Sequence, residues 1–328
     1  MLEETLSSLS TSPLALALDL GGTKLSLGLF SYEKKALKKV KVPIQKESFQ
    51  SSVRQIRTAA EALLRESQLE SRELAGVGVI VPGIYYADTG MAWAPNLWGR
   101  EPVPLREELS GLASCPVRID SDRAGYVLGE QWAGIARGKK DVVFVAIGTG
   151  IGAGITSGGQ LCRGASGIAG ALGWMAVNPL WKPIYREVGC LEAEAAGPAV
   201  VRKAREKLLQ GESSLLTTRF ENDPMNLTAE QVVQAAREGD SLALSVLEEV
   251  AGYLAMAVAN LISLLNPEMI VLGGGLMQAG DLILQPIRRR LQEWAQPVAA
   301  PQTRIELSQL GEDAGLYGAA CLAFGNAG

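Results

Sequence analysis

Three short turns rich in glycine carry the residue types that bind phosphate groups. Glycine lets backbone N–H groups approach an anion closely, and successive N–H groups in such a turn form an anion-binding concavity. Each turn follows an apolar run that is typical of a strand. The turns comprise Asp19, Gly21, Gly22, Thr23 and Lys24 in the first, Gly148, Thr149, Gly150 and Gly152 in the second, and Gly273, Gly274 and Gly275 in the third.

The first turn also carries an acid, because Asp19 stands near the end of the apolar run Leu14–Leu20. A carboxylate beside bound phosphates can hold Mg²⁺ directly or through water. Thr23 and Thr149 add hydroxyl donors, and Lys24 adds a positive charge. Neither of the usual phosphate-binding patterns, GxxxxGK[ST] or GxGxxG, is present. Taken singly, each turn is better explained as a tight hairpin; three in one chain favour nucleotide binding.

The 328-residue sequence contains no histidine. This excludes Ser-His-Asp and Cys-His sites and any histidine-ligated metal, so a general base must be a carboxylate, lysine, tyrosine or cysteine. Asp122 is the candidate, since it follows the expected strand PVRID and precedes an expected helix. An aspartate there is equally typical of a helix N-cap. Asp120 is the local alternative, because strand residues two apart point the same way.

Hydrophobic periodicity predicts strands alternating with helices, with each glycine turn at the end of a strand. In the first part of the chain we expect strands at residues 14–20, 25–31, 36–43, 75–83 and 116–122, and helices at 50–67 and 123–136. Residues 141–159 then repeat the strand, glycine turn and strand of the first hairpin, which favours an internal duplication. Further along we expect helices at 190–209, 228–238, 241–265, 283–294 and 313–325, strands at 269–275 and 303–307, and a surface loop at 210–227. This alternation predicts an α/β fold with helices covering mixed sheets.

Composition narrows the class of protein. The length predicts two lobes, and the net charge of -4 gives no basic footprint for nucleic acid. No apolar run is expected to reach membrane-spanning length, because charges or glycines interrupt each one, and the acidic N-terminal stretch lacks a signal-peptide pattern, so we expect a cytoplasmic protein. The scattered cysteines are expected to be reduced thiols.

The motifs DLGGTK, VPG with APNL, SD, GTGIG, GCLE and IVLGGG, in this order from about Leu14 to the C-terminus, resemble the ROK family. That family of sugar kinases and sugar-responsive repressors belongs to the actin-like, hexokinase-like ATPases. The resemblance implies two RNase H-like lobes that close over ATP, Mg²⁺ and a sugar, with one phosphate hairpin in each lobe. The expected lobes are residues 1–121 joined by about 309–328, and residues 122–308. A homodimer is common in the family.

The resemblance also implies roles for single residues. Asp122 matches the catalytic aspartate of the family motif Asn-Asp-Ala-Asn, in which Ser121 and Arg123 replace the first asparagine and the alanine. Gly83, Asn96 and Glu192 match residues that bind the sugar. Without the family, Gly83 and Asn96 would be explained as turn residues and Glu192 as an acid at the start of a helix. The three glycine turns would hold the nucleotide, and Asp19 the Mg²⁺.

The sequence departs from the family pattern at the sugar end and at the zinc motif. Ala171 and Trp174 stand where the family carries the glutamate and histidine of Gly-Glu-x-Gly-His, and that histidine contacts both sugar and zinc. The motif Cys-x-Cys-Gly-x-x-Gly-Cys retains only its last glycine and cysteine, since its positions are taken by Pro183, Tyr185, Arg186, Gly189 and Cys190. One cysteine cannot form a four-ligand zinc site, so we expect none. Trp174 is expected to fill the hole left by the zinc loop, ahead of stacking on a sugar.

Three functions follow from these observations. An ATP-dependent sugar kinase is expected from the turns and Asp122, with ATP and a sugar as its small-molecule partners. A transcription regulator is not expected, because only residues 1–13 precede the first expected strand and the charge is negative. The alternative is a catalytically weak sugar- or nucleotide-binding relic, which Ala171 and Trp174 favour.

Overall fold

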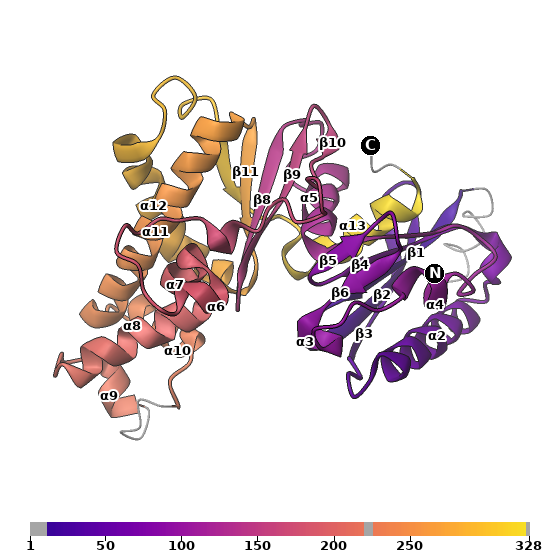
Figure 1. Ribbon diagram of the computed structural model, residues 1–328, viewed down its shortest axis with the longest axis horizontal. Helices are drawn as coiled ribbons and strands as arrows, with labels where there is room; N and C mark the ends of the chain where they lie inside the picture. Colours follow the sequence, from indigo (N-terminus) through magenta and orange to yellow (C-terminus); the bar gives the residue numbers. More distant parts are fainter. Residues whose placement is uncertain (1–11, 220–225, 326–328) are drawn as a thin grey trace. The chain divides into compact units, whose positions relative to one another are not determined.

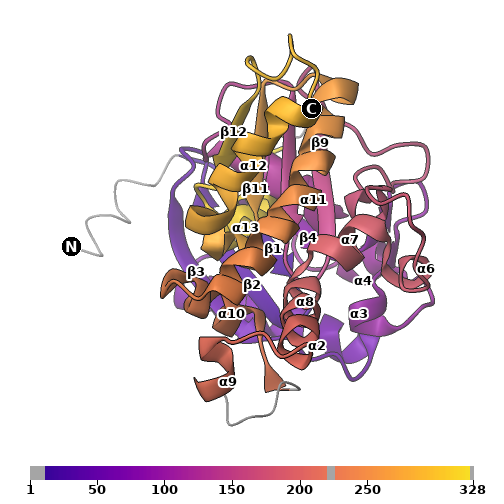
Figure 2. The same cartoon turned by 90° about the vertical axis from the view of Figure 1, so that its left-hand side faces the viewer.

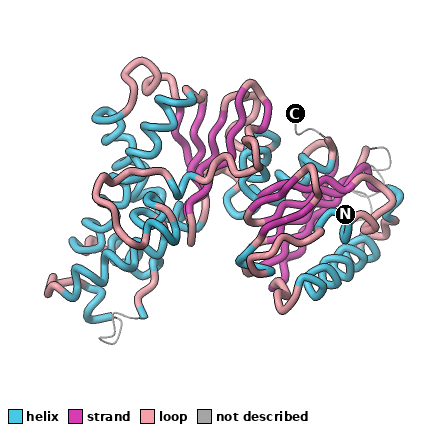
Figure 3. The backbone as a smooth tube through the Cα atoms, viewed as in Figure 1, coloured by secondary structure: helices cyan, strands magenta, loops and turns pink. Residues whose placement is uncertain are grey.

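The computed structural model describes residues 12–219 and 226–325, and its chain forms two compact units. The first unit comprises Met1–Gly138, Gly154–Ala169 and Glu312–Gly328, and the second comprises Lys139–Ala153 and Gly170–Gly311. Each unit combines strands of a five-stranded sheet with covering helices (Figures 1 and 3). The predicted lobe boundary between residues 121 and 122 stays a prediction.

The two five-stranded sheets repeat one strand order. The first sheet has the order β3-β2-β1-β4-β7 and the second β10-β9-β8-β11-β12. β1, β2 and β3 pair antiparallel, whereas β4 and β7 continue the sheet in parallel, so the sheet is mixed. In the second sheet β10 pairs antiparallel with β9, while β8, β11 and β12 run parallel. The predicted α/β class with mixed sheets is confirmed, and the repeated order agrees with the echo between the two hairpins.

Most strands have the expected bounds. They are β1 (Leu14–Leu20), β2 (Lys24–Ser31), β3 (Ala36–Pro43), β4 (Leu74–Val81), β5 (Ile84–Tyr86), β6 (Met91–Trp93), β7 (Val117–Ser121), β8 (Val142–Ile147), β9 (Ile151–Ser157), β10 (Gln160–Leu161), β11 (Met269–Gly273) and β12 (Arg304–Leu307). The small hairpin of β5 and β6 was not expected from the sequence, because each strand has only three residues.

Helices cover the sheets, and short 3-10 segments connect several elements. The α-helices are α2 (Phe49–Glu66), α3 (Pro95–Trp98), α4 (Leu105–Leu109), α5 (Asp122–Trp132), α6 (Tyr185–Val188), α7 (Cys190–Ala195), α8 (Gly197–Leu209), α9 (Leu215–Arg219), α10 (Ala229–Arg237), α11 (Ser241–Leu265), α12 (Gly280–Trp294) and α13 (Ala314–Ala323). The 3-10 segments are Ser71–Glu73, Leu172–Trp174, Gly275–Ala279 and Gly311–Asp313.

Two expectations for the second half are corrected. The helix expected at 190–209 is broken into α7 and α8, because Ala196 adopts an extended conformation just before Gly197-Pro198. Proline is favoured in a first helical turn, so it starts α8 afresh. The loop expected at 210–227 contains α9, while its residues 220–225 lie outside the described part of the chain.

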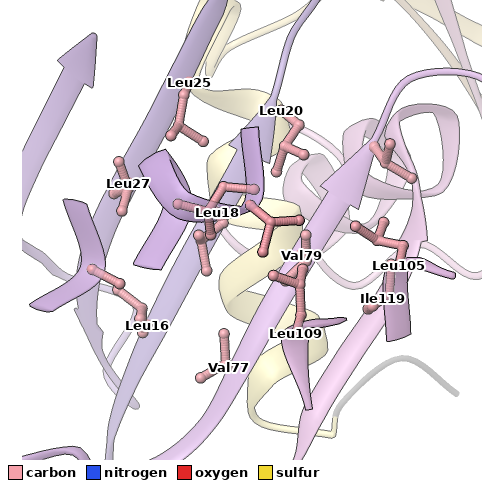
Figure 4. Packing of buried hydrophobic residues seen from close by; sticks show 14 of the residues in the cluster. Leu16, Leu18, Leu20, Leu25, Leu27, Val77, Val79, Leu105, Leu109 and Ile119 are labelled. Carbon is pink, nitrogen blue, oxygen red and sulfur yellow. The ribbon is translucent and has the colours of Figure 1, made fainter. Parts of the chain in front are cut away.

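Strand β1 separates two apolar layers of the first unit. Successive strand residues point to opposite faces of a sheet. Leu16 and Leu18 join the core that includes residues of α2. The close-up of this core shows both leucines among Leu20, Val77 and Val79 (Figure 4). Ala17 instead packs in the cluster that includes residues of α5 and α13. The same alternation places Asp19 on the α5 and α13 face of the sheet.

Helix α11 of the second unit is a core helix. It is long and apolar enough to span a membrane, with a mean hydropathy of 1.6, so the expectation that no apolar segment reaches that length was wrong. However, 61% of its most apolar stretch is buried inside the protein. It packs against α12, and Figures 1 and 2 both show the two helices side by side. Burial against protein accounts for its apolar character.

Helix α13 lies directly on the backbone of the first unit. A β-carbon at Gly78 of β4 would overlap the carbonyl oxygen of Ala319, and one at Gly129 of α5 would overlap that of Ala314. Both glycines are therefore required by the close approach of neighbouring backbones and not by a turn.

We expect Gly78→Ala to lower the free energy of unfolding by about 1–3 kcal/mol. An added methyl group in a tightly packed core forces backbone and side-chain shifts that cost this much. Denaturant unfolding measures it. The matched control is Gly111→Ala, at an exposed glycine whose nearest neighbour to an added β-carbon is an arginine nitrogen 3.8 Å away. Equal stability of the two variants would contradict the close approach of α13.

Candidate active site

Asp19 lies near the end of β1, next to the start of α13. A β-carbon built on Gly315 would lie 2.6 Å from the Asp19 Oδ2 atom, so the glycine leaves room for the carboxylate. Burial, followed by the charge of Asp122, raises the pKa of Asp19 to about 7, while Lys41 acts in the opposite sense. Two half-buried carboxylates in one site make ionisation of both costly. Asp19 and Asp122, far apart in the sequence, are therefore brought together.

Asp122 is the first residue of α5 and is not its N-cap. The cap is Ser121, whose hydroxyl accepts a hydrogen bond from the Ala124 N–H at 3.3 Å. Burial raises the pKa of Asp122 to about 6, against the opposing charge of Arg123. The N-cap explanation of Asp122 was thus wrong, although its Oδ1 atom accepts the Arg123 N–H of the first helical turn at 2.8 Å.

The rival acid, Asp120, is engaged elsewhere. Its Oδ2 atom lies 2.7 Å from Nη2 of Arg163, and its Oδ1 atom accepts the Ser121 N–H at 2.8 Å. Both carboxylate oxygens of Asp120 are thus occupied, one by a guanidinium and one by a backbone N–H. Arg163 follows β10 by two residues, and no sequence pattern indicated this pairing.

Arg123 ties two turns to the start of α5. Its Nη2 atom donates to the Gly83 carbonyl oxygen at 3.1 Å, and its Nη1 atom donates to that of Ala169 at 3.3 Å. Gly83 has a φ of +96° and packs so closely on the Trp93 carbonyl that a β-carbon would overlap it. Asn96 lies shortly after, exposed on α3. The structure thus joins Gly83 to Arg123 and to the chain that leads to Asn96.

Tyr126 is a neighbour that the sequence reasoning missed. Burial, followed by the charges of Asp122 and Asp19, raises its pKa well above the usual value. Residues four apart on a helix lie on one face, and this spacing from Asp122 was the available signal.

The first glycine turn contains one glycine that folding does not explain. Gly21 donates its N–H to the Lys24 carbonyl at 2.8 Å, which closes the turn. Gly22 is exposed, and an added β-carbon there would meet no atom within 4 Å. Thr23 and Lys24 are also exposed, and Lys46, which the sequence reasoning missed, donates from Nζ to the Gly22 carbonyl at 3.3 Å. The turn offers exposed N–H groups flanked by lysines.

The second and third glycine turns meet in the second unit. They follow β8 and β11, which are parallel neighbours, so both turns lie at the carboxyl edge of that sheet. A β-carbon on Gly148 would lie 3.8 Å from the Gly275 backbone nitrogen, and Gly274, with a φ of +92°, packs on Ile147. Ligand sites of α/β sheets lie at this edge. Two turns more than 120 residues apart in the sequence thus form one surface, to which Thr149 adds an exposed side chain.

The remaining glycines of these turns have local roles. A β-carbon on Gly273 would collide with the ring of Phe144, and one on Gly150 would lie 2.8 Å from Oε2 of Glu192. Gly152 lies within β9.

Glu192 connects the second turn to α7. Its Oε2 atom accepts the Ile151 N–H at 2.7 Å. A β-carbon on Gly173 would lie 2.9 Å from the same oxygen, so the segment before Trp174 also packs on this carboxylate. Burial raises the pKa of Glu192, although the Ile151 N–H opposes the shift. The acid is more than a first-turn residue of a helix, because it holds the start of β9.

Trp174 does not fill a hole. Its side chain is 58% exposed, which corrects the expectation that it is buried in place of a zinc loop. An exposed indole presents an apolar face and an N–H to a ligand or to solvent. Ala171 adopts a turn conformation that precedes the 3-10 segment Leu172–Trp174.

The residues at the family's zinc positions do not fit that metal. Cys190 is buried, and its Sγ atom accepts the Val177 N–H at 3.4 Å. Pro183, Tyr185 and Arg186 supply no thiolate. Within residues 12–219 and 226–325, no group of three or more histidine, cysteine, aspartate or glutamate side chains is arranged to hold a metal ion. Mg²⁺ is less demanding, since it commonly binds through one or two carboxylates and substrate phosphates, a role that Asp19 fits.

Comparison with known proteins connects this geometry to one family. The model of the ROK family matches residues 15–325. The chain is 36% identical over 309 residues to the glucokinase of Thermotoga maritima, a match that covers 94% of this chain and 96% of that enzyme.

Solved structures agree on the fold. A ROK family glucokinase from Streptomyces griseus in complex with glucose and AMPPNP has a TM-score of 0.76 at 29% identity, covering 94% of this chain and 99% of that one. A ROK family transcriptional regulator, a homologue of the E. coli MLC protein, has a TM-score of 0.84 at 25% identity, covering 94% of this chain and 77% of that one. The predicted hexokinase-like, actin-like ATPase fold is confirmed.

Asp19→Asn should remove a pH dependence of stability. Asp19 in the folded chain has a pKa of about 7, whereas the ordinary pKa of an aspartate, which applies to the unfolded chain, is 3.8. The folded state therefore binds more protons between these values, and stability falls as pH rises through them. As the pH rises from 4.5 to 8, the free energy of unfolding of the variant should increase relative to that of wild type by about 1–3 kcal/mol.

Urea unfolding at both pH values measures this gain. Asp88→Asn, at an exposed aspartate, is the control and should track wild type. The same pH slope for wild type and Asp19→Asn would contradict the half-buried, charge-coupled state of Asp19.

Proposed function

Because the chain belongs to the ROK family, we propose that it is an ATP-dependent sugar kinase, a glucokinase-like enzyme that phosphorylates a sugar hydroxyl. The observation that carries the proposal is the pair of half-buried carboxylates with raised pKa values, Asp19 and Asp122, in one unit. Two acids with different duties are what phosphoryl transfer to an alcohol needs: one beside the metal and phosphates, and one to accept the hydroxyl proton.

Asp122 is the proposed general base. A base works best when its pKa lies near the working pH, and burial brings the pKa of Asp122 to about 6. The N-cap of α5 is Ser121 and the ion pair with Arg163 is made by Asp120, so neither of these contacts occupies Asp122. Asp122 would hold the sugar hydroxyl by a hydrogen bond and take its proton as the bond to phosphorus forms.

The glycine turns are the proposed nucleotide site. Gly22, Gly148 and Gly275 have room around them that folding does not use, and their N–H groups belong to turns at strand ends. Thr23, Lys24 and Thr149 would add donors, and Asp19 would hold Mg²⁺, whose chemistry is to neutralise charge on the phosphates. The complex of the Streptomyces griseus glucokinase with AMPPNP supports ATP as the donor.

The sugar would be held by Gly83, Asn96 and Glu192 together with Asp122. Ala171 cannot accept a hydrogen bond from a hydroxyl through its side chain, so the hydroxyl that the family glutamate binds is held less well or is absent from the substrate. The exposed face of Trp174 is suited to stack on a sugar ring. These two residues favour a substrate other than glucose.

The second candidate is a catalytically weak relic that binds sugar or nucleotide. Ala171 and Trp174 are the residues that favour it. Asp122, Asp19 and the open space at Gly22 oppose it, because a relic has no need of a costly pair of half-buried acids. A DNA-binding role is not proposed, since the chain carries a net charge of -4. We propose a cytoplasmic homodimer without zinc.

ADP formation with Mg²⁺ and ATP should be measured across hexoses, amino sugars and N-acetylated sugars. One sugar class should be turned over, and Asp122→Asn should lose about 10²- to 10⁴-fold in kcat, the usual contribution of a general base. Its ATP affinity should remain within about twofold. The wild-type kcat/KM should fall below about pH 6, where Asp122 becomes protonated.

Two outcomes would contradict the proposal. Absence of turnover on every sugar, with ATP still bound, would favour the relic. Loss of ATP binding in Asp122→Asn would make Asp122 a scaffold residue instead of a base.

Gly22→Val tests the phosphate turn. The added side chain meets no protein atom within 4 Å of its β-carbon, so thermal stability should stay near that of wild type. The side chain would occupy the space that phosphates need, and the Kd for ATP should rise about tenfold or more, equivalent to about 1.4 kcal/mol. Calorimetric titration with ATP measures it, with Gly111→Val as the exposed-glycine control. An unchanged Kd would exclude the turn from the nucleotide site.

A further inference from the structure

An ion-paired cluster centred on Glu194 occupies the region of the missing zinc motif. Glu194 lies on α7 and is fully buried. The hydroxyl of Tyr185 from α6 donates to its Oε1 atom, and Lys182 pairs with the same oxygen. Lys203 of α8 pairs with Oε2 at 3.0 Å. Three stretches of the second unit thus converge on one carboxylate.

The cluster is closed by further contacts of its members. Lys203 is itself buried, pairs with Glu249 of α11, and has Nζ 4.9 Å from the centre of the Tyr253 ring. The side-chain amide of Asn178 donates to the Tyr185 oxygen at 3.0 Å. Although burial opposes ionisation, hydrogen bonds from Lys182, Tyr185 and Lys203 lower the pKa of Glu194 to about 2. The carboxylate is therefore charged and fully partnered across the physiological range.

The cluster is positioned to act on Glu192, the proposed sugar ligand. Glu192 and Glu194 lie two residues apart on α7, a helix of six residues. A β-carbon on Gly189, between α6 and α7, would overlap the Gly173 carbonyl and lie 2.8 Å from the Trp174 Cα atom. Gly189 thus packs against the start of the segment from Trp174 to Glu192. Within that segment, Tyr185 is bound to Glu194 by a hydrogen bond.

We propose that Tyr185 and Glu194 do for the segment 175–190 what zinc does in ROK members with the cysteine motif, fixing α6 to α7 and so setting the position of Glu192 without a metal. Tyr185 stands at the place of the second cysteine of that motif, and its hydroxyl makes the link that a thiolate would make through zinc. As a statement about sugar binding, the inference rests on the proposed function.

A structural alternative, that the cluster only adds stability, is less favoured on physical grounds. Burying several charges costs desolvation, and well-packed apolar residues often give equal or greater stability. The desolvation cost of these buried charges is better explained if the cluster serves to hold α6 and α7 in one defined geometry. Tyr185 and Glu194 are therefore positioning residues, since neither needs to touch the sugar.

The first test is metal content. The full-length protein, purified without a chelator, should contain far less than one zinc per chain, and its melting temperature, and its activity once Mg²⁺ is restored, should not change after dialysis against EDTA. Stoichiometric zinc, or a loss of stability on chelation that added Zn²⁺ reverses, would overturn the inference.

The second test loosens the cluster from two sides. Tyr185→Phe removes the donor hydroxyl and keeps the ring, while Glu194→Gln removes the charge. Glu187→Gln, at an exposed glutamate of α6, is the matched control. Hydrogen exchange of residues 175–190 should quicken at least severalfold in both cluster variants, with amides of β8 and β11 unchanged. If Glu194→Gln unfolds, Tyr185→Phe alone decides.

Kinetics separate positioning from general stability. In Tyr185→Phe the KM for the sugar should rise severalfold, with the KM for ATP and the kcat close to wild type, because Glu192 moves while the phosphate turns do not. Equal loss in both KM values, or no change in exchange and KM alike, would overturn the inference. Metal content and exchange need no turnover, so they decide the cluster's role even if no sugar is phosphorylated and the kinase proposal fails.

Discussion

The close approach of α13 to α5 is the contact on which the two carboxylates depend. Backbone meets backbone there, because a β-carbon at Gly318 would overlap the Gly125 carbonyl and one at Gly129 would overlap that of Ala314. The approach brings the start of α13 to Asp19, with only the hydrogen of Gly315 between them. It also sets α5, and with it Asp122, against the same face of the sheet. Larger side chains at the helix contact would separate the acids.

Ionisation of Asp19 and Asp122 costs free energy in the unliganded chain, because both carboxylates are partly removed from water. Burial raises the pKa of Asp19, and the charge of Asp122 raises it further. Natural proteins break local rules of this kind mainly at functional sites. Under the proposed function this cost would have a use, since Asp19 would hold the cation beside the phosphates and Asp122 would accept the hydroxyl proton.

The strands and the carboxylates were predictable because they rest on local signals. The apolar runs of β1 and β8 fix the position of each hairpin, and an acid at a strand end is visible in the sequence itself. The break between α7 and α8 was missed, since an apolar run continues through Ala196 and only the Gly197-Pro198 step marks it. The exposure of Trp174 could not be predicted either, because an indole suits a core and a surface equally.

Contacts between distant segments explain the remaining misses. Nothing in the local sequence indicates that Arg163 pairs with Asp120, or that Lys203 pairs with Glu194. Buried ion pairs have no period or motif, since they depend on where α8 crosses α7 and where β10 ends. Such pairings become visible only when the backbone is known, and they hold the segments that carry the proposed sugar ligands.

The glycines show how structure changes an argument that the sequence leaves ambiguous. The sequence alone does not show why a given position, such as Gly78, Gly22 or Gly275, is glycine. A tight hairpin and a bound phosphate would both account for a glycine in a turn. In the structure, Gly78 packs against the backbone carbonyl of Ala319. Gly22 and Gly275 instead face open space, and neither has a positive φ that would require glycine. A glycine at a strand-end turn, where the fold would accept a side chain, is consistent with a constraint from outside the fold. A ligand that must approach the backbone is such a constraint, and a phosphate group at a strand end meets it.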